Sequence, residues 1–371
     1  MSDSWLSERT QKFDSSGIRK VFDLAERMSA PINLSIGQPD FDVPNEAKQA
    51  AIDAIVSGKN GYSVTQGIAA LRQRLEAEIQ QQYGHADRRV LITSGTSGGL
   101  VLAMLAMINP GDEVIVFDPY FVMYPPLVSM VGGVPVLVDT YPDFRLDVNR
   151  VREAITPRTK AILLNSPANP TGITAREDEV RALARLAAER KVALVSDEIY
   201  RLYCYDGPFF SPAAENPRTL VLDGFSKTHG MTGWRVGFAH GPDELIEAMT
   251  RLQQFTFVCA PHPFQWGAVA ALDVEMQSAR DAYRRKRDLV WEGLRDKFDI
   301  ARPDGAFYMF PKSPWGTATQ FVEAAIKREV LIIPGSVFSR RDTHFRLSYA
   351  ADDRTLRRGI DTLRQVAEQG S

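Results

Sequence analysis

The sequence predicts an α/β fold, with a mostly parallel seven-stranded sheet in a large domain and a smaller α+β domain beside it. Through the middle of the chain, short apolar runs rich in β-branched residues alternate with segments of helical length. Strands that read as continuous apolar runs are typical of a parallel sheet covered by helices on both faces. With 371 residues, the chain is also too long for one compact core.

The seven expected strands share this apolar composition, and helix-length segments separate most of them. They are residues 90–92, 114–117, 134–138, 161–164, 192–195, 220–222 and 236–239. A helix reaching Met107 follows the first strand, and residues 177–190 have the charged, amphipathic pattern of a surface helix. Ligands of such sheets bind at the carboxyl ends of the strands, so the residues just after these runs are candidates for a site.

The pattern changes from about residue 263. A long helical stretch leads to the basic run 284–287, for which a solvated helix face is expected. Short strands are expected at 306–310, 330–333 and 344–348, mixed with helices. This mixture predicts an α+β second domain.

Composition and charge exclude several classes of function. With a net charge of -2, 44% hydrophobic and 24% charged residues, the chain gives no reason to expect a nucleic-acid partner or an anionic membrane surface. The longest apolar stretches, such as 100–108, are too short to span a bilayer, and residues 1–30 lack the apolar centre of a signal peptide. The histidines lie far apart, so no metal site is expected. Two cysteines are too few for a disulfide scaffold, which favours a reducing cytoplasm.

The most specific chemical signal is Lys227, in the segment GFSKTHGMTGWRVG at residues 224–237. A lysine amine can form a Schiff base with a carbonyl group. Arg235, eight positions later, can hold phosphate oxygens in a bidentate manner. This pair suits a cofactor that carries both a carbonyl group and a phosphate.

Two further motifs follow expected strands. The sequence DEIY, residues 197–200, follows the strand at 192–195, and NPTG, residues 169–172, follows the strand at 161–164. Alone, these motifs also fit a strand end and an ordinary turn. A lysine for an aldehyde, an acid for a ring nitrogen and a phenol for a ring hydroxyl together describe pyridoxal 5′-phosphate.

These motifs resemble those of the class I and II aminotransferases, which are fold-type I pyridoxal-phosphate enzymes. The resemblance runs nearly end to end, from GQPDF at residues 37–41 to FRLSY at residues 345–349, and the segments 165–172 and 224–237 are its most specific parts. It implies a transaminase that moves an amino group between an L-amino acid and a 2-oxo acid by a ping-pong mechanism.

The resemblance also implies the domain organisation. In the family, the N-terminal segment packs with the C-terminal part of the chain. We therefore expect a large cofactor-binding domain of residues 46–275 and a small domain formed by residues 1–45 together with residues 276–371.

The resemblance assigns the cofactor phosphate to three segments. Thr96 and Ser97 lie in the loop TSGTSGG, where backbone N–H groups and hydroxyls at a helix start form an anion site. Arg235 is expected to be the main cationic clamp, and Ser226 a weaker ligand. Many relatives have a serine three residues before the lysine, where this chain has Gly224.

Four side chains are expected around the cofactor ring by the same resemblance. Phe121 stacks on the ring, and Asp197 stays ionised beside the ring nitrogen and keeps it protonated. Asn169 and Tyr200 hydrogen-bond the ring hydroxyl oxygen and lower the proton affinity of the neighbouring imine. Tyr124 occupies a position that lies behind the ring nitrogen in relatives.

For the substrate, the resemblance assigns the α-carboxylate to Arg346, with contacts from Asn169 and the backbone at Gly37. An arginine within an apolar strand is unusual unless it is paired, so the residue type itself favours a functional role. Lys227 is expected to shuttle a proton between the substrate and the cofactor. Tyr62, in KNGYS, matches a tyrosine that reaches the neighbouring subunit's phosphate, which predicts a homodimer with shared active sites.

Two other functions fit parts of this pattern. A carbon–sulfur β-lyase on the same scaffold shares every cofactor motif, but it releases pyruvate from a β-substituted amino acid without a 2-oxo acid. A cofactor-sensing regulator needs a DNA-binding domain, for which the thirty residues before Pro31 are too few. The donor stays open among aromatic, aliphatic, methionine and alanine types. Ser97 stands where aspartate-type relatives often have a lysine, which argues against a dicarboxylate specialist.

Overall fold

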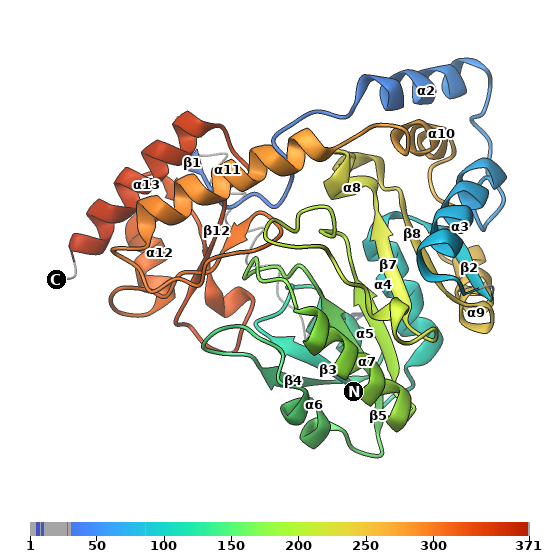
Figure 1. The fold of residues 1–371 in the computed structure, drawn as a ribbon, viewed down its shortest axis with the longest axis horizontal. Coiled ribbons are helices and arrows are strands. Elements are labelled where there is room, and N and C mark those ends of the chain that lie inside the picture. The colour runs from blue at the N-terminus through green and yellow to red at the C-terminus, as the bar shows by residue number, and fades with distance from the viewer. Residues whose placement is uncertain (1–4, 8, 11–27, 29–30, 86, 370–371) are drawn as a thin grey trace.

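The computed structural model describes residues 5–7, 9–10, 28, 31–85 and 87–369. Seven strands form one sheet in the order β2-β8-β7-β6-β5-β3-β4 (Figure 1). They are β2 (Arg88–Thr93), β3 (Glu113–Asp118), β4 (Val134–Asp139), β5 (Thr159–Asn165), β6 (Ala193–Asp197), β7 (Leu220–Gly224) and β8 (Gly237–Pro242). Only β8 runs antiparallel to its neighbours, β2 and β7. The expected mostly parallel seven-stranded sheet is therefore confirmed.

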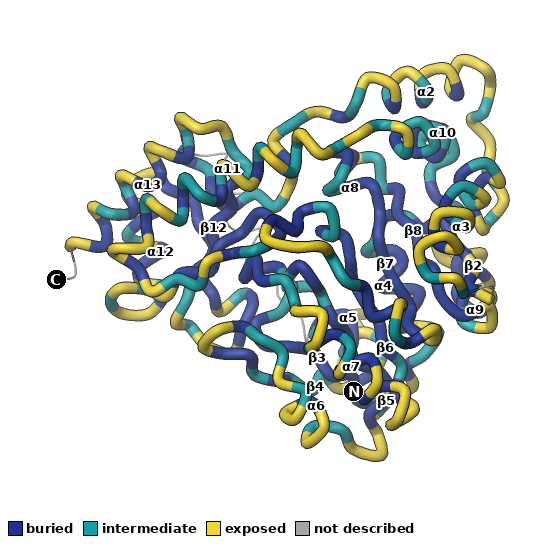
Figure 2. Tube along the Cα trace, in the orientation of Figure 1, coloured by how far each residue is buried: buried dark blue, intermediate teal, exposed yellow. Residues whose placement is uncertain are grey.

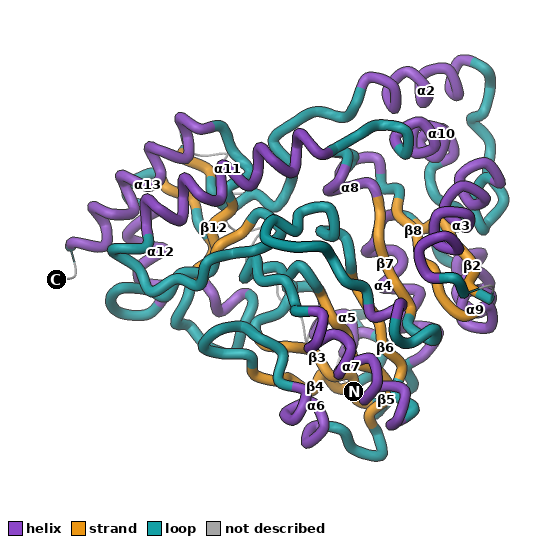
Figure 3. Tube along the Cα trace, viewed as in Figure 1, coloured by secondary structure: helices purple, strands orange, loops and turns teal. Residues whose placement is uncertain are grey.

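Helices cover both faces of this sheet (Figure 3). Those packed against its strands are α3 (Ala69–Tyr83), α4 (Gly95–Met107), α5 (Tyr124–Met130), α6 (Val148–Ala154), α7 (Glu177–Arg190) and α9 (Asp243–Gln254). This part of the chain also contains α2 (Asn45–Val56) and α10 (His262–Ala271), which pack on each other, and the short α8 (Phe225–Thr228), which follows β7 directly. In β3, Val114 and Val116 pack with α4, α5 and α9, whereas Ile115 and Phe117 pack with α6 and α7. Burial on both faces is why the strands read as continuous apolar runs.

The C-terminal part combines helices with short strands. Its elements are α11 (Gln277–Leu294), β9 (Tyr308–Met309), α12 (Ala318–Ile326), β10 (Val330–Leu331), β11 (Ile333–Pro334), β12 (Phe345–Ser348) and α13 (Asp353–Glu368). Strands β11, β12 and β9 form an antiparallel sheet, and β1 (Ile32–Asn33) pairs in parallel with β10. The segment around β1 thus contacts the C-terminal elements, while the domain boundaries at 45/46 and 275/276 stay a prediction.

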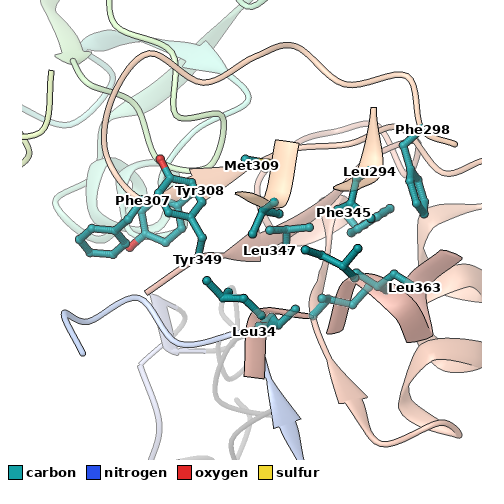
Figure 4. Packing of buried hydrophobic residues seen from close by; sticks show 14 of the residues in the cluster. Leu34, Leu294, Phe298, Phe307, Tyr308, Met309, Phe345, Leu347, Tyr349 and Leu363 are labelled. Atoms are coloured by element: carbon teal, nitrogen blue, oxygen red, sulfur yellow. The ribbon is translucent and has the colours of Figure 1, made fainter. Parts of the chain in front are cut away.

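A core rich in aromatic residues holds the C-terminal part together (Figure 4). Phe345 and Leu347 of β12 pack with Leu294 of α11 and Leu363 of α13, and all four are fully buried. Figure 2 shows burial along the chain, with buried strands inside and exposed helix surfaces outside. Among the described residues, no helix has both the length and the apolar character needed to cross a membrane.

The expectation of a solvated face for the basic run 284–287 is wrong for Arg287. Its side chain is fully buried, and it donates to Asp206 at 3.1 Å and to the carbonyl oxygen of Pro303 at 2.5 Å. The positions 284 and 285 are exposed as expected. Arg287 is buried because a carboxylate and a backbone carbonyl, both distant in sequence, satisfy its guanidinium.

Candidate active site

A cavity of about 300 Å³ lies at the carboxyl ends of the parallel strands and reaches β12 of the second sheet. All the predicted site residues except Tyr62 line it. They are Gly37, Thr96, Ser97, Phe121, Asn169, Asp197, Tyr200, Ser226, Lys227, Arg235 and Arg346. The motifs come together because strand ends that are distant in sequence meet at one edge of the sheet.

Lys227 lies on the short helix α8, directly after β7, and its amine faces this cavity. Its Nζ donates a hydrogen bond to the carbonyl oxygen of Gly37 at 2.5 Å. Burial, together with the positive charges of Arg346 and Arg235, lowers the pKa of Lys227 to about 8. About a tenth of the amine is therefore unprotonated at pH 7, far more than for an ordinary lysine, and the unprotonated form is the one that acts as a nucleophile or a proton acceptor.

Asp197 ends β6 and is buried at the bottom of the cavity. Its Oδ2 accepts from the hydroxyl of Tyr124 at 2.7 Å, and its Oδ1 accepts from the backbone N–H of Ile199 at 3.3 Å. Burial raises the pKa of Asp197 to about 6, although the hydrogen bond from Tyr124 opposes the rise. A cation placed against this carboxylate would restore the charged form.

Arg346 is carried by β12 and is almost fully buried. Its Nη1 donates to Oδ1 of Asn169 at 3.0 Å and its Nη2 to the carbonyl oxygen of Ser35 at 2.8 Å. The guanidinium lies 4.7 Å and 4.6 Å from the ring centres of Tyr308 and Phe338. Within the described chain, Nε has no hydrogen-bond partner.

Burial lowers the pKa of Arg346, since none of these neighbours carries a negative charge. A buried guanidinium without a carboxylate partner costs free energy. An anionic ligand removes that cost, and a planar fork with an unused donor suits a carboxylate.

The opposite end of the cavity is suited to a phosphate. There α4 begins at Gly95, whose φ of 68° brings the first turn close to Arg235. A Cβ atom at Gly95 would lie 2.3 Å from Nη2 of Arg235, so the contact requires glycine. Thr96 and Ser97 add hydroxyls and N–H groups at the helix start, which is the arrangement that binds phosphate.

The structure explains why Gly224 replaces the serine of many relatives. A Cβ atom at residue 224 would lie 2.8 Å from the Cα of Gly237 and 3.3 Å from Oγ1 of Thr96. A serine therefore does not fit between β7, β8 and the start of α4. Ser226 is buried and lines the cavity, so a hydroxyl is still present at this end.

The residues expected to contact the cofactor ring line the same cavity. Phe121 lines the cavity and meets the ring of Tyr124 edge-on, with centroids 5.5 Å apart. Asn169 is placed by Asn165, whose Oδ1 accepts from the Asn169 backbone N–H at 2.9 Å. The hydroxyl of Tyr200 lies 2.9 Å from that of Tyr308.

Tyr62 lies outside the cavity. It follows α2, its side chain is 84% exposed, and no hydrogen bond of its hydroxyl to the described residues is found. Exposed apolar side chains flank Tyr62 in the chain, with Val56 at 82% and Val64 at 59%. The end of α9, next to the exposed Phe255, is joined to this segment by a hydrogen bond from Gln253 to the carbonyl oxygen of Thr65. Phe257, also partly exposed, lies close to Gly98, so an apolar side chain is present beside the start of α4 as well.

Sequence reasoning missed several residues of the cavity. Tyr308, Gln38 and Thr232 line it, and Ser35 binds Arg346 through its backbone. Tyr308 belongs to an expected strand, but nothing in the sequence distinguishes it from the aromatic core residues around it. Ser35 contributes only a carbonyl oxygen, which leaves no signal in the residue type.

Comparison with known proteins gives consistent matches over nearly the whole chain. The model of the family "Aminotransferase class I and II" matches residues 29–363. A probable aspartate aminotransferase of Methanocaldococcus jannaschii is 36% identical, over 98% of this chain and 100% of that protein. Aromatic-amino-acid aminotransferase 2 of Thermococcus litoralis is 35% identical, over 98% of both chains. The solved structure of Thermus thermophilus aspartate aminotransferase with maleate has a TM-score of 0.94 at 38% identity, covering 98% of this chain and 100% of that one.

Proposed function

Because this chain belongs to the class I and II aminotransferases, we propose that Lys227, Asp197 and Arg346 form the centre of its active site. The chain is a fold-type I, pyridoxal-phosphate-dependent aminotransferase, which moves an amino group between an amino acid and a 2-oxo acid. The observation that carries the assignment of residues is the buried amine of Lys227, with its pKa lowered to about 8, in the same cavity as Asp197 and Arg346.

The donor set of this cavity fits pyridoxal phosphate. Thr96, Ser97, Ser226 and Arg235 would hold the phosphate at the start of α4, and Phe121 would stack on the ring. Asp197 would face the ring nitrogen, and Asn169 and Tyr200 would face the ring hydroxyl oxygen. Bound through Lys227, the cofactor supplies an electron sink for chemistry at the Cα atom of the amino acid.

The side chains of the protein bind and orient the substrate, and they move one proton. Arg346 fixes the α-carboxylate of the substrate, so Cα is presented to Lys227. Lys227 takes the proton from Cα and returns it on the cofactor side. Since amino acids and 2-oxo acids share the α-carboxylate, one clamp serves both substrates in turn, which supports a ping-pong mechanism.

Replacing Arg346 by alanine is expected to raise KM for every amino acid and every 2-oxo acid together. The loss of a charged, bidentate contact is worth roughly 3–5 kcal/mol, which corresponds to a KM rise of about two to four orders of magnitude. Steady-state kinetics with an acidic and a neutral donor measures this effect. A rise restricted to dicarboxylic substrates would show that Arg346 binds the side chain instead.

We propose that neutral donors are accepted. Among the described residues that line the cavity, the cations are Lys227, Arg235 and Arg346, and each already has a role. Ser97 adds no positive charge for a second carboxylate. The aspartate and aromatic names of the relatives leave both classes to be tested.

A donor panel with 2-oxoglutarate or pyruvate as acceptor tests the function. Transfer of the amino group from at least one donor, followed by the appearance of the new amino acid, is expected. Pyruvate released from a β-substituted amino acid without any acceptor would instead indicate a β-lyase. A panel in which aspartate alone reacts would contradict the proposed neutral donors.

We also propose that the enzyme is a homodimer in which Tyr62 reaches the phosphate of the neighbouring subunit. The exposed apolar side chains Val56 and Val64, which flank Tyr62 in the chain, and Phe255 just after α9 support this, because large exposed apolar patches mark interaction surfaces. The outer side of α2 is exposed in Figure 2. We further propose a cytoplasmic location, given two cysteines that are both free.

Subunit mixing is expected to reveal the shared site. Tyr62→Ala removes a phosphate ligand from the partner's site, and Lys227→Ala inactivates its own site. After exchange, one site of the mixed dimer has both groups, so the activity should exceed the sum of the two separate proteins. Val134→Ser, on the exposed edge strand β4, is the matched control and should bind the cofactor normally. A fully active monomer in sedimentation experiments would rule out the shared site.

A further inference from the structure

Tyr308 lies on β9 and is buried against the cavity, with 1% of its surface exposed. The register of the antiparallel pair places it opposite Ser348 of β12, two residues beyond Arg346. Residues two apart on a strand share a face of the sheet. Tyr308 and Arg346 therefore point to the same side, towards the cavity.

Tyr308 contacts one residue proposed to bind the cofactor and one proposed to bind the substrate. Its hydroxyl lies 2.9 Å from the hydroxyl of Tyr200, and the two rings meet edge-on at 86° with centroids 5.7 Å apart. The guanidinium of Arg346 lies 4.7 Å from the centre of its ring. One side chain thus touches the phenol proposed for the cofactor ring oxygen and the cation proposed for the substrate carboxylate.

Gly37 makes room for this hydroxyl. A Cβ atom at residue 37 would lie 2.7 Å from Oη of Tyr308, which is closer than such atoms approach. The carbonyl oxygen of the same glycine accepts from Nζ of Lys227. The position of Tyr308 is therefore fixed by its contacts with three parts of the site.

The direction of the hydrogen bond between the two phenols matters, because each phenol has a single proton. If Tyr200 donated to Tyr308, it would have no proton left for a cofactor oxygen. If Tyr308 donates, the proton of Tyr200 is free, and the accepted bond strengthens Tyr200 as a donor. Burial raises the pKa of Tyr200 well above its ordinary value and raises that of Tyr308 less far, and the guanidinium of Arg346 lies against the Tyr308 ring, so Tyr308 is the phenol suited to donate.

We propose that Tyr308 is a positioning residue that acts through Tyr200. It donates its phenol proton to the Tyr200 oxygen and thereby keeps the Tyr200 proton directed at the ring oxygen of the cofactor. This inference rests on the role proposed above for Tyr200. Because a hydrogen bond to the ring oxygen lowers the proton affinity of the linkage to Lys227, Tyr308 should lower the pKa of that linkage indirectly.

The test is a pH titration of the visible absorbance of the cofactor-loaded enzyme without substrate. Tyr200→Phe should raise the midpoint most. Tyr308→Phe keeps the ring against Arg346 but loses the proton, and should raise the midpoint by about half a pH unit or more. Since Tyr308 acts through Tyr200, the double variant should titrate like Tyr200→Phe alone. Tyr141→Phe, which removes a buried hydroxyl bonded to Ser339 outside the cavity, should leave the midpoint unchanged.

The outcomes separate this inference from the function on which it rests. A wild-type protein without the lysine-linked absorbance would overturn the assignment of Lys227. No shift in Tyr200→Phe would overturn the role of Tyr200. A shift in Tyr200→Phe with none in Tyr308→Phe would overturn the role of Tyr308 alone. Fully additive shifts in the double variant would show that Tyr308 acts independently of Tyr200, against the proposal.

Discussion

Replacing Lys227 by alanine is expected to abolish transamination, with a loss in kcat of about four orders of magnitude or more. In the proposed mechanism the amine is both the attachment point of the cofactor and the group that moves the substrate proton, so its loss would remove two functions at once. Absorbance after borohydride reduction and gel filtration provides the measurement. The wild type should retain the cofactor covalently, and the variant should release it on denaturation.

Lys160→Ala is a suitable control, because Lys160 is an exposed residue of β5 that does not line the cavity. That variant should retain both the covalent cofactor and the activity. Full activity in Lys227→Ala would contradict the mechanism. Covalent cofactor in that variant would show that another lysine carries it.

Asp197→Asn is expected to lose far more in kcat than in cofactor content. The amide can still accept the hydrogen bond from Tyr124, but it cannot hold a proton on the ring nitrogen by charge. Removing one member of a buried charge pair commonly costs ~3–5 kcal/mol, which corresponds to a fall in kcat of about two to four orders of magnitude. Single-turnover kinetics with the loaded variant measures the chemical step directly.

The neighbouring Glu198 offers a matched control. It is also fully buried, and burial raises its pKa to about 7, but it accepts from Ser211 at 2.6 Å and does not line the cavity. Glu198→Gln should therefore keep its kcat. Similar losses in both variants would show that buried negative charge near β6 matters for folding rather than for the cofactor ring.

Thermal unfolding of the cofactor-free protein gives a second reading of Asp197. Burial raises the pKa of Asp197 from 3.8 to about 6, so the folded state prefers the protonated carboxyl group. Protonation of Asp197 therefore stabilises the folded state by up to about 3 kcal/mol. This stabilisation is fully present below the pKa of the unfolded state and is lost as the pH rises through about 6. The asparagine variant has no such loss, so without cofactor it should melt above the wild type at pH 8 and approach it near pH 4.

Much of the sheet could be predicted from the sequence because both faces of its strands are buried. Val114 to Phe117 are all apolar since they alternate between two helical layers, and this leaves an unbroken apolar run. The antiparallel direction of β8, in contrast, could not be predicted from the sequence. A strand has the same composition in either direction, and only its pairing with β2 and β7 reveals the difference.

The site was predictable where a residue type is unusual for its place. Arg346 within an apolar strand and Lys227 after one are such cases. Tyr308 was not, because an aromatic residue in a strand beside other aromatics is ordinary core composition. The burial of Arg287 was not predictable because one of the carboxylates that pair with it, Asp206, lies 81 residues away in the chain.

The two guanidinium groups that lower the pKa of Lys227 have a consequence for the timing of proton transfer. Arg346 and Arg235 are the charges proposed to receive the substrate carboxylate and the cofactor phosphate. Each bound anion neutralises the repulsion that its arginine exerts on the amine, so the basicity of the free amine increases with occupancy. Lys227 is then the strongest base when both anionic groups are bound, and weaker in an empty or half-filled site.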